Sequence, residues 1–388
     1  GGSFYLSGSN NLSFQNNQFI NGRTCNLCLD TSTDVNIYNN TIVDAGRNLG
    51  YSAPNLQYSG NNFHIENNVI LNASSVNVDS NAINSTLQNN TIGHAPYGVY
   101  LNSGSQINIE SNNFVFGDTG IAFDTYSQAV IFNNTFSDQQ NQNVLLFSSP
   151  SNLLFDSNSF NINSAPNINF GGATMTNVSL INNNFTSLSD NLYLDSSSGL
   201  YASGNRFTGI SSGVRIRPSS TNNQFYYNTF LGCGYGILVE GGSSNQFNFN
   251  NISASTNYGV QLSSGSSNTF NSNNIFLNPR GINIGTANNT LGQNNHFYNN
   301  TYSIYVDSAS DIRFFNLTNS IFDSTGLFAD YSNVSVSETS SSSDVFNLNW
   351  TSAPVPPPLL PTNTTSIGNR YINIINVTNT LDISSATF

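Results

Sequence analysis

The sequence contains no lysine, and only 7% of its 388 residues are charged, where about 25% is usual for soluble proteins. All eight basic residues are arginines: Arg23, Arg47, Arg206, Arg215, Arg217, Arg280, Arg313 and Arg370. The formal net charge of −12 argues against the basic face that nucleic-acid binding needs. No apolar run approaches the roughly 18 residues of a membrane span. We therefore expect neither a nucleic-acid partner nor a membrane span.

Residues that serve metal and redox chemistry are also scarce. The pair Cys25-x-x-Cys28 has no second pair and no thioredoxin-like pattern, so it predicts a local disulfide or small packing residues. We expect Cys233 to be buried and inert. The histidines and the single methionine are scattered along the chain: His64, His94, His296 and Met175. We therefore expect no metal site and no cofactor.

What is abundant is neutral polarity, because asparagine, serine and threonine dominate the sequence. With 37% hydrophobic and 12% aromatic residues, the chain can still bury a core. At acidic pH carboxylates lose their charge near a pKa of about 4, whereas lysines would stay charged and repel one another. We interpret the composition as that of an extracellular cell-surface protein of an acid-living archaeon, with drift in codon usage as the alternative. Because the chain begins at Gly1, either a signal peptide has been removed or the start is missing.

Sequons of the form Asn-x-Ser/Thr recur along the chain, although this composition alone would produce about as many. In a glycosylating host they would make the protein a heavily decorated glycoprotein with N-linked glycans as partners. The candidate asparagines are Asn11, Asn39, Asn72, Asn84, Asn89, Asn133, Asn177, Asn184, Asn251, Asn288, Asn299, Asn316, Asn333, Asn349, Asn363 and Asn376.

An internal repeat decides the fold class. A segment of the form apolar-x-x-Asn-x-Phe/Ile returns about every 23 residues. Its anchor asparagines are Asn17, Asn40, Asn68, Asn90, Asn112, Asn134, Asn158, Asn183, Asn205, Asn228, Asn250, Asn273, Asn295 and Asn319. Between anchors runs a second motif of a small residue followed by alternating apolar and polar residues, as in Gly98-Val99-Tyr100-Leu101 and Gly236-Ile237-Leu238-Val239. Both motifs have the period of two that is typical of strands.

These periods predict an all-β solenoid of about 14–15 coils, with three short strands in each coil and little or no helix. Coils would stack at about 4.8 Å. The anchor asparagines should form a hydrogen-bonded ladder at a tight turn, where asparagine tolerates left-handed backbone geometry. We expect Phe114, Phe136, Phe160 and Phe185 to form an internal stack.

The two motifs resemble those of the right-handed parallel β-helix superfamily, which includes pectate-lyase-like enzymes and NosD-type surface proteins. The resemblance covers about residues 4–351 and implies a single right-handed parallel β-helix. It indicates the fold more than the function, because the superfamily includes lyases, hydrolases, adhesins and structural proteins.

We divide the chain into a β-helix (1–352), a Pro-rich linker (353–361) and a C-terminal β-strand tail (362–388). The linker should be extended and stiff. The tail alternates apolar and polar residues as a strand with one buried face does, and it is a candidate donor strand. Its candidate assembly residues are Ile375, Val377, Leu381 and Ile383.

Three groups of residues are candidates for chemistry or binding. The carboxylates Glu66 and Glu110 should lie two coils apart, with Gln88 between them. This separation is near the upper end of that in inverting glycosidases, although two solvated side chains are the simpler interpretation. A second group, Asp195, Arg217 and Glu240, should stack outward as a surface ion triad. A third group of outward tyrosines could stack on sugar rings or be ordinary surface residues: Tyr100, Tyr193 and Tyr305.

The resemblance implies clustered aspartates for calcium in lyases or for acid–base catalysis in hydrolases, and no such cluster is evident. We therefore expect no enzyme. The first hypothesis is an extracellular structural protein whose copies assemble end to end into a filament or layer, by donor-strand addition. The repeat starts within the first dozen residues and leaves little room for a cap. An uncapped coil exposes a sheet edge that can pair with another copy, which favours the assembly hypothesis. The alternatives are a polysaccharide lyase or hydrolase and a carbohydrate-binding adhesin.

Overall fold

The computed structural model describes residues 3–46, 53–73, 76–78, 82–147, 150–161, 164–171, 174–285, 288–291 and 294–306, and beyond them the short strands named below. Within these residues the chain is all strands and turns, without a helix. It forms a right-handed parallel β-helix of about 12 turns. The predicted fold class is therefore confirmed. The predicted number of 14–15 coils came from counting the anchor asparagines, and one of these, Asn319, lies outside the described residues.

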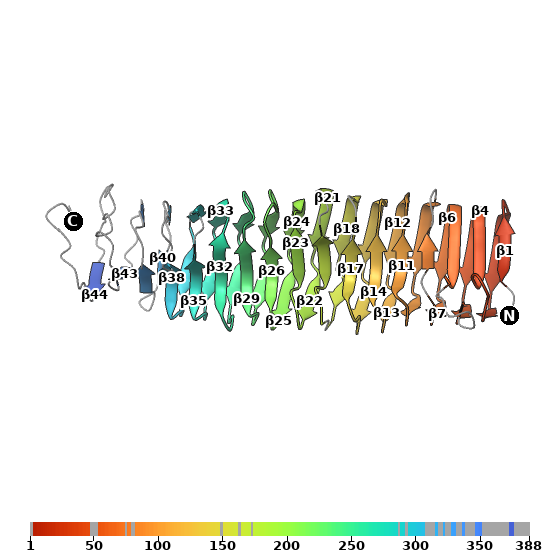
Figure 1. The fold of residues 1–388 in the computed structure, drawn as a ribbon, viewed down its shortest axis with the longest axis horizontal. Coiled ribbons are helices and arrows are strands. Elements are labelled where there is room, and N and C mark those ends of the chain that lie inside the picture. The colour runs from red at the N-terminus through yellow and green to blue at the C-terminus, as the bar shows by residue number, and fades with distance from the viewer. Residues whose placement is uncertain are drawn as a thin grey trace. The chain divides into compact units, whose positions relative to one another are not determined.

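The chain divides into two compact units. The first comprises Gly1–Tyr193 with Ser197–Tyr201, and the second comprises Leu194–Ser196 with Ala202–Phe388. In both units each coil carries three strands, because the repeat alternates three short period-two segments with turns. Equivalent strands pair in parallel with the next coil. Figure 1 shows this for β1, β4 and β6 of the first unit and for β26, β29 and β32 of the second.

The glycine-strand stack contains the strands that follow the small-residue motif. In the first unit its strands are β1 (Phe4–Ser7), the start of β4 (Leu27–Tyr38), the start of β6 (Leu56–Glu66), β8 (Val76–Val78), β11 (Tyr97–Leu101), β14 (Thr119–Phe123), β17 (Gln142–Leu146) and β20 (Ile168–Gly171). Residues of β23 (Leu192–Asp195) belong to both units. The second unit continues with β26 (Ser212–Ile216), β29 (Tyr235–Glu240), β32 (Tyr258–Ser264), β35 (Arg280–Ile284), β38 (Tyr302–Val306), β41 (Leu327–Asp330), β43 (Phe346–Trp350) and β44 (Ile372–Ile375).

The pre-anchor stack contains the strands that end just before the anchor asparagines. Its first-unit strands are β2 (Asn10–Gln15), the ends of β4 and β6, β9 (Ala82–Gln88), β12 (Gly104–Glu110), β15 (Ser127–Phe132), β18 (Ser151–Asp156) and β21 (Thr174–Ile181), and β24 (Ser198–Ser203) has residues in both units. Its second-unit strands are β27 (Gln224–Tyr226), β30 (Gln246–Asn248), β33 (Ser266–Asn271) and β36 (Asn288–Leu291), and a separate pair is formed by β39 (Phe315–Asn316) and β42 (Val336–Ser337).

The anchor-strand stack follows the asparagines. In the first unit its strands are β3 (Gln18–Ile20), β5 (Thr41–Val43), β7 (Val69–Leu71), β10 (Thr91–Gly93), β13 (Asn113–Val115), β16 (Thr135–Ser137), β19 (Ser159–Phe160) and β22 (Asn184–Ser187). In the second unit they are β25 (Arg206–Gly209), β28 (Thr229–Leu231), β31 (Asn251–Ser253), β34 (Asn274–Phe276), β37 (His296–Tyr298) and β40 (Ile321–Phe322). The glycine-strand and pre-anchor stacks form one sheet, because β4 and β6 run on from one stack into the other.

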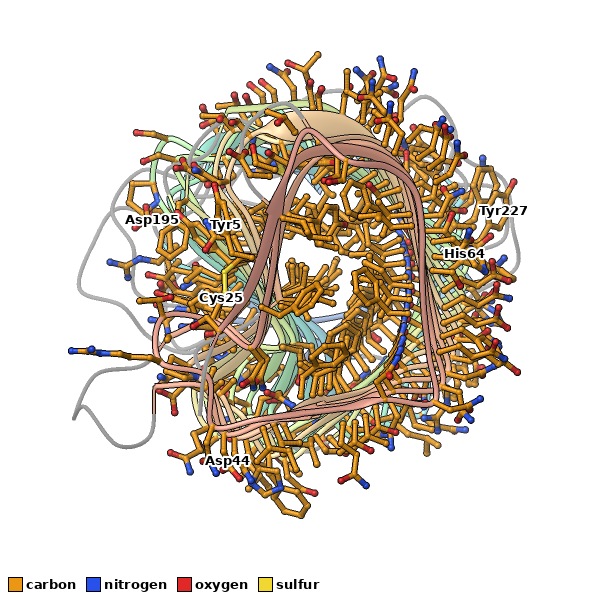
Figure 2. The ribbon with its side chains drawn as sticks, turned by 90° about the vertical axis from the view of Figure 1, so that its right-hand side faces the viewer. Tyr5, Cys25, Asp44, His64, Asp195 and Tyr227 are labelled. Atoms are coloured by element: carbon orange, nitrogen blue, oxygen red, sulfur yellow. A yellow bond between two sulfur atoms is a disulfide. The ribbon has the colours of Figure 1, made fainter. Side chains whose placement is uncertain are left out.

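Apolar columns fill the inside of each unit. Phe114, Phe136, Phe160 and Phe185 are fully buried, with successive ring centroids 4.6, 4.8 and 4.6 Å apart. Figure 2 shows carbon-rich side chains directed inward from the coil walls. The glycine motif has a packing reason, because a Cβ on Gly213 would lie 2.6 Å from the carbonyl oxygen of Gly236 in the next coil. Glycine lets the coils approach this closely.

The anchor asparagines form a ladder within each unit. In the first unit the side-chain amide of each donates to the next side-chain oxygen at 3.0 Å, from Asn40 to Asn183. In the second unit the same bonds run from Asn205 to Asn295 at 3.0–3.1 Å. Asn17 is exposed and binds Asn40 through its backbone N–H, at 2.9 Å.

One detail of the turn prediction is wrong. The left-handed backbone belongs to the residue before the anchor, with φ of 53° at Asn89 and 55° at Ser111, and not to Asn90 or Asn112. The anchors are buried, and their amides bind backbone carbonyls of neighbouring strands, as Asn112 Nδ2 binds the oxygen of Leu87 at 2.8 Å. The left-handed residue makes the bend, and the buried side chain of the anchor stabilises it by hydrogen bonds to the backbone.

Candidate functional surfaces

The structure places Glu66, Gln88 and Glu110 in one column of the pre-anchor stack, as the sequence predicted. Glu66 contacts His64 of the same strand, with 2.9 Å between Oε2 and Nε2, and both point outward (His64 in Figure 2). The two carboxylates are separated by the whole coil that carries Gln88. Across the part of the chain that the structure describes, no three His, Cys, Asp or Glu side chains gather in a way that could hold a metal ion.

The predicted triad is organised differently from the expectation. Glu240 accepts two hydrogen bonds from Arg215, both 3.0 Å, and one from Arg217 at 2.9 Å. Partial burial by itself would raise the pKa of the Glu240 carboxyl, but the hydrogen bonds from Arg215 and Arg217 outweigh it and the pKa is lowered. Asp195 is the last residue of β23. Sequence reasoning missed Arg215, which occupies the outward, partly exposed position next to the end of β26.

The tyrosine prediction leads to a larger surface in the second unit. The guanidinium of Arg280 lies 3.5 Å from the ring centroid of Tyr305 and 4.8 Å from that of Tyr258. Arg280 also donates to Asn283 Oδ1 at 2.6 Å, and Asn283 donates to Gln261 Oε1 at 2.7 Å. We call this surface the tyrosine–arginine face, and its residues are Tyr235, Tyr258, Gln261, Arg280, Asn283, Tyr302 and Tyr305.

The other two tyrosines lie on the same stack. Tyr100 packs against Tyr97, with ring centroids 5.5 Å apart. Burial raises the pKa of Tyr100, and the charge of Asp124 adds to the effect. Tyr193 is half-buried in β23. The glycine-strand stack therefore carries outward tyrosines in both units, and in the second unit they surround an arginine.

The sequon asparagines whose side chains the structure describes lie outside this stack, whereas Asn349 belongs to its strand β43. Every candidate asparagine whose side chain the structure describes is exposed and lies at a corner between strands or in the pre-anchor or anchor-strand stack. Most have the left-handed backbone of a corner, with φ of 53–61°. These asparagines are Asn11, Asn39, Asn72, Asn84, Asn89, Asn133, Asn177, Asn184, Asn251 and Asn299. Glycans at these positions would leave the tyrosine–arginine face uncovered.

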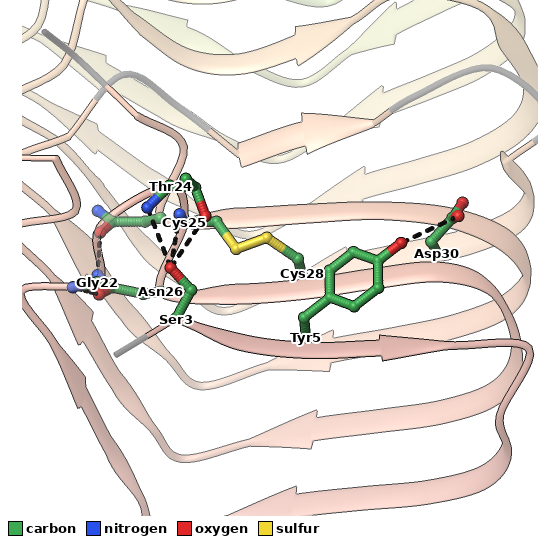
Figure 3. The surroundings of a disulfide bond; sticks show 9 residues. Ser3, Tyr5, Gly22, Thr24, Cys25, Asn26, Cys28 and Asp30 are labelled. Carbon is green, nitrogen blue, oxygen red and sulfur yellow. Dashed lines mark hydrogen bonds between the residues drawn. A yellow bond between two sulfur atoms is a disulfide. The ribbon is translucent and has the colours of Figure 1, made fainter. Parts of the chain in front are cut away.

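The sulfur atoms of Cys25 and Cys28 form a disulfide, with the two Cα atoms 6.0 Å apart. Figure 3 shows it beside Tyr5, whose hydroxyl donates to Asp30 at 3.4 Å. Cys233 is fully buried, and burial raises the pKa of its thiol to about 12. A thiol with such a pKa is not a nucleophile near neutral pH.

Two features had no counterpart in the sequence reasoning. Shorter asparagine ladders join successive coils at other positions, such as Asn143 to Asn167 at 2.6 Å and Asn245 to Asn268 at 2.9 Å. The sequence did indicate the ladder of Asn143 and Asn167, because these asparagines replace the glycine of the second motif. A groove of about 610 Å³ also opens in the first unit, lined among others by Asp44, His94 and Phe116. The rings of His94 and Phe116 stack at 5.4 Å.

A parallel three-strand coil with stacked asparagines and aromatic rings defines a β-helix protein, and comparisons with known proteins agree. Residues 119–276 match the family model described as right handed beta helix region, and residues 1–177 match the one described as periplasmic copper-binding protein (NosD). The chain belongs to the right-handed parallel β-helix superfamily.

Among solved structures, the chain is similar to a mutant of the periplasmic alginate epimerase AlgG, with 13% identity, coverage of 79% of this chain and 78% of that chain, and a TM-score of 0.43. It is also similar to PfbA, a surface adhesin of Streptococcus pneumoniae, with 12% identity, coverage of 86% and 87%, and a TM-score of 0.32. No curated protein matches the sequence. Within the described residues, no helix has the length and hydropathy that a membrane crossing requires.

Proposed function

We propose that this protein is a structural component of the outer cell surface whose copies assemble end to end, and that it is not an enzyme. An extracellular or periplasmic location is supported by the match to a family model described as periplasmic. The Cys25–Cys28 disulfide also fits an oxidising compartment. The neutral, lysine-free composition fits a surface exposed to acid, as in an acid-living archaeon.

The observation that carries the assembly proposal is the repetition of one bonding pattern from coil to coil. Each coil offers the next a row of strand N–H and C=O groups, an asparagine amide and an apolar ring. Any coil surface of this kind can therefore accept a matching strand from another copy.

The C-terminal tail is the segment proposed to make this contact. Its strand β44 pairs in parallel with β43 of the same chain, with Ile374 opposite Leu348 and Ile375 opposite Asn349. The other candidate assembly residues, Val377, Leu381 and Ile383, lie outside the described residues. In the assembly, the tail would form the same kind of parallel pair with a neighbouring copy.

Truncation after Ser352 tests the proposal. The truncated protein should keep its strand signal in circular dichroism and should fail to form filaments in electron micrographs. A peptide of residues 362–388 should bind to it. Filaments that persist without the tail would overturn the proposal, as would a truncated chain that unfolds.

A full-length pair of variants separates assembly from folding. Because the apolar residues of the tail alternate, Ile375→Asp should block filaments while Thr380→Asp should permit them. Equal behaviour of the two variants would contradict donor-strand assembly.

A second candidate function is carbohydrate binding by the tyrosine–arginine face. Arg280 packs on the rings of Tyr258 and Tyr305, and the side-chain amides of Gln261 and Asn283 lie beside it. Sugars bind to surfaces of this kind by stacking on the rings and by hydrogen bonds to the polar groups. The position of the described sequon side chains away from this stack also favours it. Retention on immobilised polysaccharide should fall with Tyr305→Ala and stay unchanged with Tyr201→Ala, an exposed tyrosine of β24. Equal retention of both variants would exclude the tyrosine–arginine face as the carbohydrate-binding site.

A further inference from the structure

Two large aromatic side chains occupy corner positions of the second unit where bulky residues are strained. Tyr227 and Phe249 have φ of 56° and 57° and are 62% and 47% exposed, and Figure 2 shows Tyr227 projecting from the surface. Their rings stack at 4.9 Å with an angle of 11°. Left-handed backbone is unfavourable for bulky residues, and other corners of this kind have Gly204 or Ser272. The two rings therefore need a reason beyond the turn itself.

Small corner residues flank this stack in the coils before and after it. The corner residues of successive coils are Gly204, Tyr227, Phe249 and Ser272, and each stands directly before an asparagine of the ladder: Asn205, Asn228, Asn250 and Asn273. One face of the Phe249 ring lies on Tyr227. Its other face looks toward the coil of Ser272, whose side chain is too small to cover a ring.

An exposed sequon asparagine lies two residues after this ring in the sequence. Asn251 is the first residue of β31, two positions after Phe249, and is exposed. Its Oδ1 accepts a hydrogen bond from Asn274 Nδ2 at 2.9 Å, and Asn274 is its partner in the next coil. The Asn251 side chain therefore leans toward the coil of Ser272, which is the side on which the Phe249 ring is open.

We propose that Asn251 carries an N-linked glycan whose first sugar ring packs on the open face of Phe249, with Tyr227 supporting that ring from behind. The C–H groups of a pyranose ring are attracted to the negative face of an aromatic ring, and the contact removes apolar surface from water. The donor is an oligosaccharide activated as an anomeric diphosphate. A bond forms from Asn251 Nδ2 to the anomeric carbon, the bond from that carbon to the diphosphate oxygen breaks, and the amide loses one proton.

The chain contains a matched site without the ring. Asn184 is also an exposed sequon asparagine and the first residue of its anchor strand, β22. The residue two positions before it, Asn182, has the same left-handed backbone, with φ of 55°. The two sites differ at the corner, which is Phe249 or Asn182, and in their sequons, which read Asn-Ile-Ser at Asn251 and Asn-Phe-Thr at Asn184. The comparison therefore depends on the change that the Phe249 variant makes in the ratio of the two rates.

The experiment uses the full chain from a host whose glycopeptides show Asn184 occupied. Glycopeptide mass spectrometry gives the occupancy of Asn251, and the rate of glycan release by a glycoamidase under native conditions is followed at both sites. Release at Asn251 should be slower than at Asn184 by about two- to tenfold, the range that an aromatic contact supports. The variant Phe249→Ser, which copies the residue at Ser272, should abolish the difference and leave the rate at Asn184 unchanged.

An unoccupied Asn251 would overturn the proposal, and so would a rate ratio that Phe249→Ser leaves unchanged. Hydrogen exchange of the peptide around Asn228 and Asn250 checks that the variant keeps its ladder. If that ladder opens, the variant Phe249→Asn, which reproduces the corner of Asn182, replaces it. The inference does not rest on end-to-end assembly, so its failure would leave the proposed function untouched.

Discussion

A buried asparagine of the ladder satisfies several polar groups at once. Asn112 is 2% exposed. Its Nδ2 donates to the carbonyl of Leu87 and to the side chain of Asn134, and its Oδ1 accepts from the backbone of Asn90. Buried polar groups of this kind cost about 1–3 kcal/mol each when they lose their partner. The ladder therefore explains how a chain so rich in asparagine can bury it.

We expect Asn112→Ala to destabilise the protein by about 2–4 kcal/mol, because it leaves several buried groups unsatisfied. The matched control is Asn113→Ala, since Asn113 is the exposed next residue. Hydrogen exchange of residues 90–134 measures the local loss of stability. In a repeat protein this is more informative than a single global unfolding transition. Similar exchange in the two variants would show that the ladder is not a source of stability.

Adjacent elements are joined on the outside by charge as well as by backbone pairing. Arg215 of β26 and Arg217, just after it, both bind Glu240 of β29. Partly exposed pairs of this type contribute less than about 1 kcal/mol each. They are compatible only with the observed register, because a shift of one strand against the next would separate the charges.

This contact should make stability depend on pH. Because the folded-state pKa of Glu240 is lowered, its ionised form stabilises the fold above the unfolded pKa of about 4.3. That contribution is lost as the pH falls through the lower folded pKa. Glu240→Gln should therefore lower the thermal midpoint at pH 7 and have little effect at the most acidic pH. Glu110→Gln controls for the loss of one carboxylate, and an equal effect of Glu240→Gln at both pH values would contradict the interpretation.

On the scale of the whole molecule, we expect chemical inertness toward acidic polysaccharides. Glu66 and Glu110 are kept apart by the coil of Gln88, a separation of about two strand spacings. Release of reducing ends and ultraviolet absorbance of unsaturated products, with and without calcium, measure hydrolysis and β-elimination. Turnover that disappears in Glu66→Gln or Glu110→Gln would show that the carboxylates act as a catalytic pair.

The mass of the native protein is a second measurement at this scale. Because the described sequon asparagines are exposed, we expect the intact mass to exceed the 41.9 kDa of the polypeptide by several kilodaltons. An unmodified mass in native material would remove the glycoprotein interpretation.

The sequence by itself determined the coil. Apolar residues at every second position, an asparagine about every 23 residues and phenylalanine or isoleucine two residues later predict inward columns, because strand geometry fixes which side chains share a face. The sequence also made a disulfide between Cys25 and Cys28 one of two expectations, because the cysteines lie only three positions apart in the chain.

Only the tertiary structure decided what happens between coils. Three contacts depend on the register of one coil against the next: Arg215 and Arg217 share Glu240, Arg280 lies over the rings of Tyr258 and Tyr305, and Phe249 stacks on Tyr227. That register is set by backbone pairing across more than 20 residues of sequence, and no local pattern carries it. The bend at each anchor was likewise misassigned by one residue, because the period locates a corner and only the backbone angles say which residue turns it.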